Sequence, residues 1–305
     1  MKKQLLIAAV AATMASVSMA DISITGAAQV NYTNTDNDDG TSSNAISHDF
    51  DLKITGKSGA TAVVMDIENV DANVDTTKAE MNVKNAYMTT SIAGVNLKAG
   101  SYFGTDSLLD NASQTADKLS LDTTISGVKV QYETAGTNLN SSSVTLSGSV
   151  AGVALSHEIF DTKTDTSVSG SFGGVNVAYR DVDADADAAD SKTSLEVSTE
   201  FQGVTATYAN VDAGTNGTTS DAFFGEITTA TDMGEAEGFG VATAMAGNTV
   251  NLKSYTLTNA TTRAEQDYTK LVVTRPLANG STLEATYTDK DSVSTTMDLE
   301  LRVKF

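Results

Sequence analysis

The chain has no cysteine, no tryptophan and only one proline among its 305 residues. Without cysteine it can form neither disulfide bonds nor thiolate metal sites, so its stability must come from backbone pairing and packing. Basic residues are also scarce: 19 Lys and Arg stand against 39 Asp and Glu, for a formal net charge of −20. Because nucleic-acid binding requires a basic face, this composition argues against a nucleic-acid partner.

Long apolar runs are missing after the first twenty residues. At the N-terminus two lysines precede an apolar stretch over residues 5–17, and the small-x-small triplet 18–20 follows it. The stretch is shorter than the roughly 20 apolar residues of a membrane-spanning helix, so we expect residues 1–20 to be a secretory signal peptide. The mature chain would then begin at Asp21. Since no later run approaches spanning length, any membrane insertion must use strands.

The residues from Thr295 to Phe305 alternate strictly between two kinds of side chain. One face of such a strand carries Met297, Leu299, Leu301, Val303 and Phe305, and the other carries Asp298, Glu300, Arg302 and Lys304. A strand with an apolar face and a charged face that ends on an aromatic residue is typical of a membrane β-barrel.

The same period of two continues through most of the chain and is interrupted by glycine turns. Eight pairs predict tight hairpin turns: Ser58-Gly59, Ala93-Gly94, Ser126-Gly127, Ala151-Gly152, Gly173-Gly174, Gln202-Gly203, Ala246-Gly247 and Asn279-Gly280. These turns join sixteen strands, and an unpaired strand at each end would raise the number to eighteen. Residues 220–247 fit either two strands or a loop and one strand, so we expect sixteen to eighteen strands. In the strand near residue 85, Met81, Val83 and Tyr87 are expected to share one face, alternating with Glu80, Lys84 and Met88.

The connections between these hairpins are longer, polar and acidic. They are expected at residues 33–45, 70–78, 102–116, 183–190 and 212–219. Short turns on one rim and long loops on the other are the layout of an outer-membrane barrel. The sequence therefore predicts an all-β, transmembrane antiparallel barrel over residues 21–305, wide enough to enclose a water-filled channel.

A secreted β-sandwich or a repetitive adhesin would also alternate, with its apolar face toward a dry core. Alternation alone does not exclude that fold. Two features favour the barrel: the polar face repeatedly carries charges of both signs on adjacent strands, and the final residue is an aromatic on the apolar face.

Four short segments carry a family likeness: DISITGAAQVNY (21–32), GSYFGTDSLLDNA (100–112), DYTKLVVTRPLANGSTLEATY (267–287) and DLELRVKF (298–305). They resemble the trimeric general porins of Gram-negative outer membranes. The resemblance implies a sixteen-stranded homotrimer in contact with outer-membrane lipid and lipopolysaccharide. It also implies that Phe305 forms part of the signal read by the outer-membrane assembly machinery.

The resemblance makes residues 102–116 the candidate constriction loop, because in porins the loop after the fifth strand folds into the barrel. Asp106 and Asp110 would face the channel from this loop. The candidate basic partners on the opposite wall are Lys53, Lys84 and Lys98. Opposed charges across a narrow gap favour small ions and polar solutes. Porins carry arginine on that wall, whereas lysine is a mobile point charge and should organise the gap less rigidly.

The acidic excess predicts a cation-preferring pore. Acidic residues in expected loops, including Asp36, Asp38, Asp39 and the run over residues 181–190, would lower the potential at the channel mouth and concentrate cations there. The expected mechanism is passive diffusion of small hydrophilic solutes and ions, which implies no cofactor and no energy source.

Two other chemistries, calcium binding and catalysis, have less support in the sequence. Asp183, Asp185 and Asp187 have alternating ligand spacing, but the run lacks the glycine and the bidentate glutamate of a calcium loop, so a solvated acidic loop is favoured. His48 and His157 are the only histidines, and no nucleophile motif surrounds any serine. We therefore expect no catalytic residue, and a lipid-modifying barrel enzyme remains the weaker alternative to a channel or a non-conducting surface protein.

Overall fold

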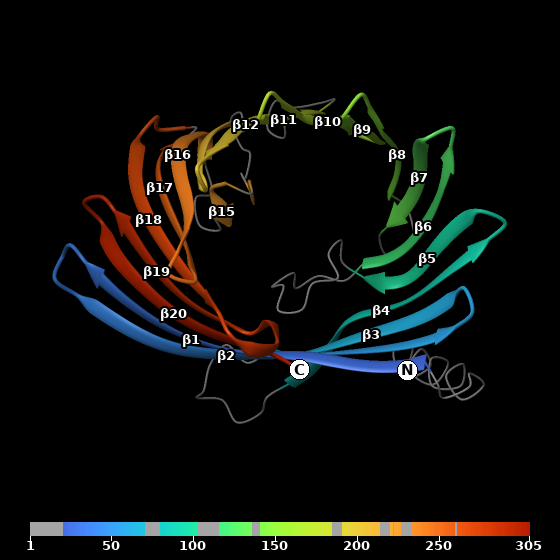
Figure 1. The fold of residues 1–305 in the computed structure, drawn as a ribbon, viewed down its shortest axis with the longest axis horizontal. Coiled ribbons are helices and arrows are strands. Elements are labelled where there is room, and N and C mark those ends of the chain that lie inside the picture. The colour runs from blue at the N-terminus through green and yellow to red at the C-terminus, as the bar shows by residue number, and fades with distance from the viewer. Residues whose placement is uncertain are drawn as a thin grey trace.

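The protein is a closed antiparallel β-barrel (Figure 1). The computed structural model describes residues 21–70, 80–102, 116–135, 141–184, 191–213, 220–221, 223–226, 233–259 and 261–305. Within those ranges, eighteen strands form one sheet and two very short strands form a second. The expected signal peptide, most of the expected constriction loop and the two aspartates assigned to it lie outside the described residues. In the described ranges no helix is both long and apolar enough to cross a membrane.

The strands follow one another around the barrel in chain order. The barrel sheet consists of β1 (Ile22–Asn37), β2 (Ser42–Ser58), β3 (Thr61–Val70), β4 (Glu80–Ile92), β5 (Val95–Tyr102), β6 (Ala116–Ile125), β7 (Val128–Ala135), β8 (Ser141–Val150), β9 (Val153–Phe160), β10 (Lys163–Phe172), β11 (Val175–Ala184), β12 (Lys192–Phe201), β13 (Val204–Asp212), β16 (Met233–Met245), β17 (Asn248–Asn259), β18 (Glu265–Pro276), β19 (Thr282–Lys290) and β20 (Ser294–Lys304). The second sheet pairs β14 (Ser220–Asp221) with β15 (Gly225–Glu226). A 3-10 turn (Ala278–Gly280) joins β18 to β19.

The glycine turns lie where the sequence predicts them, except that the first is displaced by one residue to Gly59–Ala60. At Ala93–Gly94, for example, both residues have positive φ, 52° and 83°, the backbone of a type I′ hairpin turn that twists with its strands. The turns at Ser126–Gly127 and Gln202–Gly203 have the same geometry. The strand number that follows from counting turns is therefore confirmed at eighteen for the described residues, and the sixteen implied by the porin resemblance is wrong for this chain.

The barrel closes at a seam between its first and last strands. β1 pairs with β2 on one side and with β20 on the other. At the end of the seam, the amide of Gly26 donates to the carbonyl of Phe305 over 2.8 Å and the amide of Phe305 donates back over 3.0 Å. The Phe305 ring lies over Gly26, at 2.4 Å from the position that a Cβ there would take, and stacks on Phe50 of β2 with ring centroids 6.0 Å apart.

One loop prediction is corrected by the structure, and one open alternative is decided. Residues 33–45 were expected to form a polar connection, yet most of them extend β1 and β2, which stay paired up to Asp36 and Ser42. Their Asn, Thr and Ser side chains suggest a loop, but β1 is paired on both sides there and the backbone bonds stabilise the extension. Residues 220–247, which the sequence left open between two strands and a loop with one strand, contribute one strand to the barrel sheet, β16, and Figure 1 shows the short strand β15 inside the barrel.

Candidate functional site

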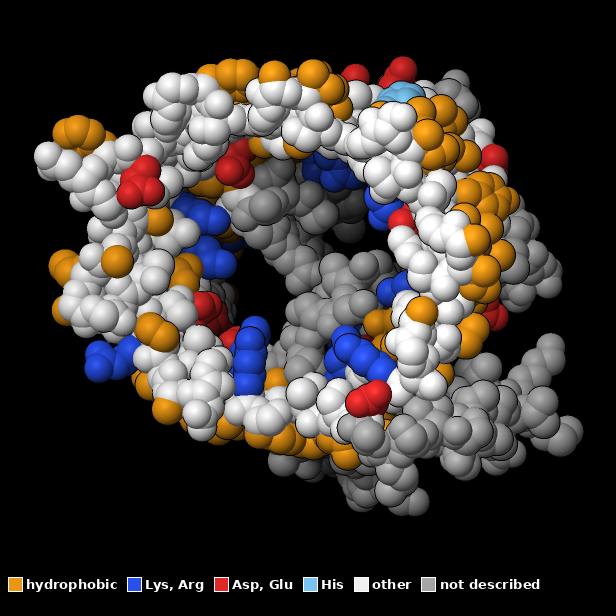
Figure 2. Space-filling view, turned by 45° about the vertical axis from the view of Figure 1, so that its right-hand side comes forward, with side chains coloured by type: hydrophobic (Ala, Val, Ile, Leu, Met, Phe, Trp, Pro, Cys, Tyr) orange, Lys and Arg blue, Asp and Glu red, His pale blue; other side chains and the backbone are white. Residues whose placement is uncertain are grey.

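The barrel has a polar inner wall and an apolar outer wall, and the strand register fixes which residues belong to each. At the seam, Val30 pairs with Leu301 on the outer face, whereas the next pair, Gln29 and Arg302, faces inward. The Gln29 amide donates to the Glu300 carboxylate over 2.9 Å and accepts from the Arg302 guanidinium over 3.1 Å. In Figure 2, Lys and Arg side chains line an open centre while hydrophobic side chains cover the outside.

Ion pairs between neighbouring strands hold many of the charges on this inner wall. Lys118 of β6 lies 3.2 Å from Glu133 of β7, and on the same two strands Lys129 lies 3.8 Å from Asp122. The Arg180 guanidinium of β11 contacts both carboxylate oxygens of Asp165 on β10. Such cross-strand pairs fix the positions of long side chains that would otherwise extend into the lumen.

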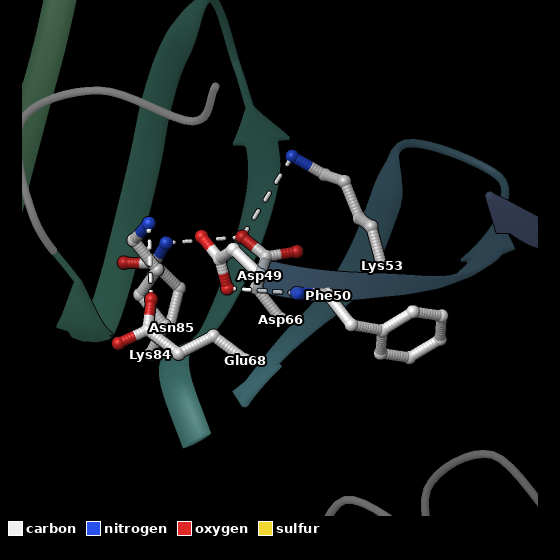
Figure 3. Close-up of polar contacts among 7 residues, drawn as sticks. All are labelled: Asp49, Phe50, Lys53, Asp66, Glu68, Lys84 and Asn85. Carbon is white, nitrogen blue, oxygen red and sulfur yellow. Dashed lines mark hydrogen bonds and ion pairs between the residues drawn. The ribbon is translucent and has the colours of Figure 1, made fainter. Parts of the chain in front are cut away.

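Two of the three lysines selected from the sequence lie together on the inner wall of β2, β3 and β4 (Figure 3). The Lys84 ammonium is 3.1 Å from the Glu68 carboxylate, and only 4% of the Lys84 side chain is exposed. The Lys53 ammonium is 3.9 Å from the Asp66 carboxylate, which also accepts a 3.0 Å hydrogen bond from the Asn85 amide. Both lysines thus contribute to a compact charge cluster on the inner wall.

This cluster depends on a β-bulge in β4. Asp66 of β3 is in register with Asn85, but the next residue, Ile67, is in register with Val83, so Lys84 is an additional residue in β4. The bulge leaves both Lys84 and Asn85 buried beside acidic residues of β3. A bulge inserts one residue and re-aims the side chains that follow it.

The bulge also overturns the predicted faces of β4. The sequence alternation placed Tyr87 on one face with Met81 and Val83, and Met88 on the other with Lys84. After the bulge the two faces are exchanged, so that Tyr87 points inward and Met88 points outward. Tyr87 is 7% exposed and packs against Val64 and Tyr102, while Met88 is 40% exposed. The physical reason is the extra residue, because a one-residue slip moves every following side chain to the other face.

The third predicted lysine, Lys98 of β5, lies between two aromatic rings. Its ammonium is 4.0 Å from the ring centroid of Tyr87 and 4.0 Å from that of Tyr102. The two rings meet edge to face with centroids 5.5 Å apart. Cation–π contacts of this kind help to hold a lysine in place. Gly100, opposite Tyr87, has φ of 144°, and a Cβ there would come within 2.3 Å of the Ala86 carbonyl.

A second group of inward side chains was not found from the sequence. Phe223 and Phe224 lie between β14 and β15 and are 5% and 3% exposed. They pack on the inner wall of three barrel strands against Ala209, Val211, Ala236, Tyr255 and Leu257. Burying each phenylalanine contributes roughly 1.5–3 kcal/mol, which is enough to fix this segment against the wall. The sequence does contain a signal for this packing. Glycine at the inward positions 238 and 240 of a strand indicates that another part of the chain approaches the strand closely.

Comparison with solved structures identifies the architecture. OccK11 (OpdR) of Pseudomonas aeruginosa is 11% identical with a TM-score of 0.70, and the match covers 93% of this chain and 96% of that one. OccK2 (OpdF) of the same organism is 9% identical with a TM-score of 0.69, over 95% and 99% of the two chains. A variant of the Rh. blastica porin is 14% identical with a TM-score of 0.57, over 93% and 100%. The chain has a porin fold. No protein-family model and no curated protein sequence matches it.

The porin fold places both histidines on the outer face of the barrel. His48 is in register with Val30 and His157 with Leu146, which are apolar outer positions. The His157 ring contacts the Thr166 hydroxyl at 2.8 Å. Neither histidine therefore faces the lumen. In the described part of the chain no three His, Asp or Glu residues gather as a metal site would require, and two of the three aspartates with calcium-like spacing, Asp185 and Asp187, lie outside it.

Proposed function

We propose that this protein is an outer-membrane porin through which small hydrophilic solutes and ions diffuse passively. One observation carries the proposal: the described strands close into a wide barrel whose inner wall is charged and whose outer wall is apolar. Wall side chains cannot fill a barrel of this width, so water occupies its centre. An apolar outer wall is stable against lipid, which supports a location in the outer membrane.

The proposed selectivity is a preference for cations. Acidic residues outnumber basic ones by 39 to 19, and the inner-wall lysines Lys53, Lys84, Lys118 and Lys129 each lie beside a carboxylate. Since these pairs largely neutralise one another, the acidic excess falls on the rest of the molecule, including the connection between β1 and β2. A negative potential at the mouth raises the local concentration of cations.

The constriction is proposed to combine the charge cluster with the loop that follows β5. Lys53, Lys84 and Lys98 supply its basic side, and Asp106 and Asp110 are proposed as its acidic side. The cluster geometry supports the basic side, since ion pairs and aromatic rings fix the three lysines on β2, β4 and β5. No catalytic residue and no cofactor belong to the proposal.

The proposal also includes export and assembly. Residues 1–20 would direct export, Phe305 would be read by the outer-membrane assembly machinery, and the barrel would form a homotrimer in contact with lipopolysaccharide. The position of the Phe305 ring on the outer face at the seam supports its availability to another protein. Chemical cross-linking of the purified protein tests the trimer, and the absence of cross-linked dimer and trimer bands would contradict it.

Conductance of the purified protein in planar lipid bilayers tests the channel. We expect stepwise currents, and in a salt gradient a reversal potential whose sign reports cation preference. The control is the same preparation after heat unfolding, which should give no steps and should migrate differently on a gel. A folded, heat-modifiable barrel without conductance would refute the channel, whereas a reversal potential of the opposite sign would refute only the cation preference.

A further inference from the structure

The segment Phe223–Phe224, called the latch below, lies inside the barrel without belonging to its wall. It is flanked by β14 and β15, which pair with each other and not with any of the barrel strands. Its two rings are among the least exposed side chains of the described residues and contact each other edge to face, with centroids 5.0 Å apart. The Phe224 ring also contacts Tyr255 of β17 at 5.7 Å. The latch is thus fixed on an apolar part of the inner wall.

Two glycines of β16 provide the surface on which the latch lies. A Cβ at Gly240 would lie 2.9 Å from Phe223 Cε2, and one at Gly238 would lie 3.0 Å from Phe223 Cε1 and 2.5 Å from Tyr255 Cβ. Glycine is costly in the middle of a strand because it loses conformational entropy and packs no side chain. Here its small size is what allows the Phe223 ring to lie flat against the strand. Phe239, between the two glycines, points outward and packs on Tyr208.

A lysine of the adjacent strand holds the latch from its backbone. The Lys253 ammonium donates a hydrogen bond to the Phe223 carbonyl. The same ammonium lies 4.7 Å from the Phe223 ring centroid. Lys253 is in register with Gly240, so one cross-strand pair supplies both the space for the ring and the bond to its backbone.

We propose that the latch is a second constriction of the channel, and that Phe223, Gly238, Gly240 and Lys253 set the size of solute that passes. This inference rests on the proposed channel function and adds a size-determining element to it. The latch is on the wall of β13, β16 and β17, whereas the predicted constriction lysines are on β2, β4 and β5. Because the latch occupies lumen space and is held by contacts rather than by strand pairing, removing those contacts widens the passage.

The decisive experiment adds volume to the wall and looks for a wider pore. In Gly240→Val, the new side chain takes the space of the Phe223 ring and displaces the latch, so single-channel conductance should rise and liposome swelling should extend to larger sugars. The matched control is Ala242→Val, which adds two methyl groups on the same inward face, two residues nearer the turn. There the added volume should leave conductance unchanged or lower it. A fall in conductance for Gly240→Val as well would overturn the inference.

A second variant keeps the test valid if Gly240→Val fails to fold. The double substitution Phe223→Ala with Phe224→Ala removes the two anchoring rings and should raise conductance and the sugar size limit. Phe239→Ala removes a ring from the outer face of the same region and should leave both unchanged. Wild-type conductance in the double variant, with heat-modifiable gel mobility, would refute the latch while leaving the channel intact. Absence of conductance in the wild-type protein would instead refute the channel itself.

Discussion

At the scale of single residues, the contact between Gly26 and Phe305 completes the end of the seam at which the barrel closes. The Phe305 ring takes the space that any side chain at position 26 would need, and it bridges β20, β1 and β2 by stacking on Phe50. The backbones of the same two residues exchange both hydrogen bonds at the end of the seam. The aromatic C-terminus that the sequence offers as an assembly signal is therefore also part of the seam.

Replacing Gly26 with valine should weaken the seam. The added side chain must displace the Phe305 ring, and overpacking of this kind costs about 1–3 kcal/mol. We expect the heat-induced gel-mobility shift to occur at a lower temperature. The control is the same substitution in a Phe305→Ala background, where the ring is gone and the cost should largely disappear. An equal loss in both backgrounds would show that the ring is not what the valine displaces.

At the scale of elements, the bulge in β4 explains why three adjacent strands carry a compact charge cluster. The extra residue, Lys84, lies on the inner wall beside Glu68, and Asn85 follows it beside Asp66. Lys84 is almost fully covered, so its partner carboxylate is also in a partly desolvated environment. Removing only one member of such a pair leaves the other charge uncompensated.

The substitution Lys84→Met should therefore destabilise the barrel by about 3 kcal/mol. The measurement is the urea-unfolding midpoint of the protein refolded into lipid vesicles. The double variant Lys84→Met with Glu68→Leu removes both charges and should recover most of the lost stability. If the single and the double variants unfold at the same midpoint, the uncompensated charge of Glu68 is not what destabilises the single variant.

The elements show how far the sequence could predict this fold. The hairpins were predictable because each tight turn needs residues that tolerate positive φ, and pairs such as Ala93–Gly94 mark them locally. The faces after the bulge were not, because a bulge changes no residue type and tyrosine is acceptable on either face. The latch was not predictable either, since its contacts join Phe223 to strands up to thirty residues away. Of the candidate site, the sequence indicated which lysines face inward, but not that carboxylates or aromatic rings would hold them.

At the scale of the whole molecule, the balance of charge links the barrel to its proposed selectivity. The chain carries a formal net charge of −20, while many inner-wall charges are matched across strands. The excess negative charge can therefore act on ions at the rim of the barrel. In the connection between β1 and β2, the Thr41 hydroxyl and amide both donate to the Asp39 carboxylate and lower the pKa of Asp39 below its ordinary value.

The cation preference should fall as the solution is acidified through the range in which carboxylates titrate, about pH 4. Because its folded pKa is lowered, Asp39 keeps its charge below the pH at which an ordinary aspartate loses it. The stabilisation that Asp39 gives this connection is present above the ordinary pKa and is lost as the pH falls through the lowered one. Reversal potentials measured between pH 7 and pH 3 test this expectation. The variant Thr41→Val should shift the last part of the decline to higher pH, and a preference that does not change with pH would exclude carboxylates as its source.

The seam also means that the barrel can close only after its last strand has been synthesised. β1 leaves the ribosome first and β20 last among the strands described, yet neither has its full set of neighbours until they meet. Every shorter version of the chain presents two open sheet edges, and open edges invite pairing with other chains. The interval between the emergence of β1 and the arrival of β20 is therefore the period in which the protein is most exposed to aggregation. Any factor that escorts it to the membrane has to cover that whole interval.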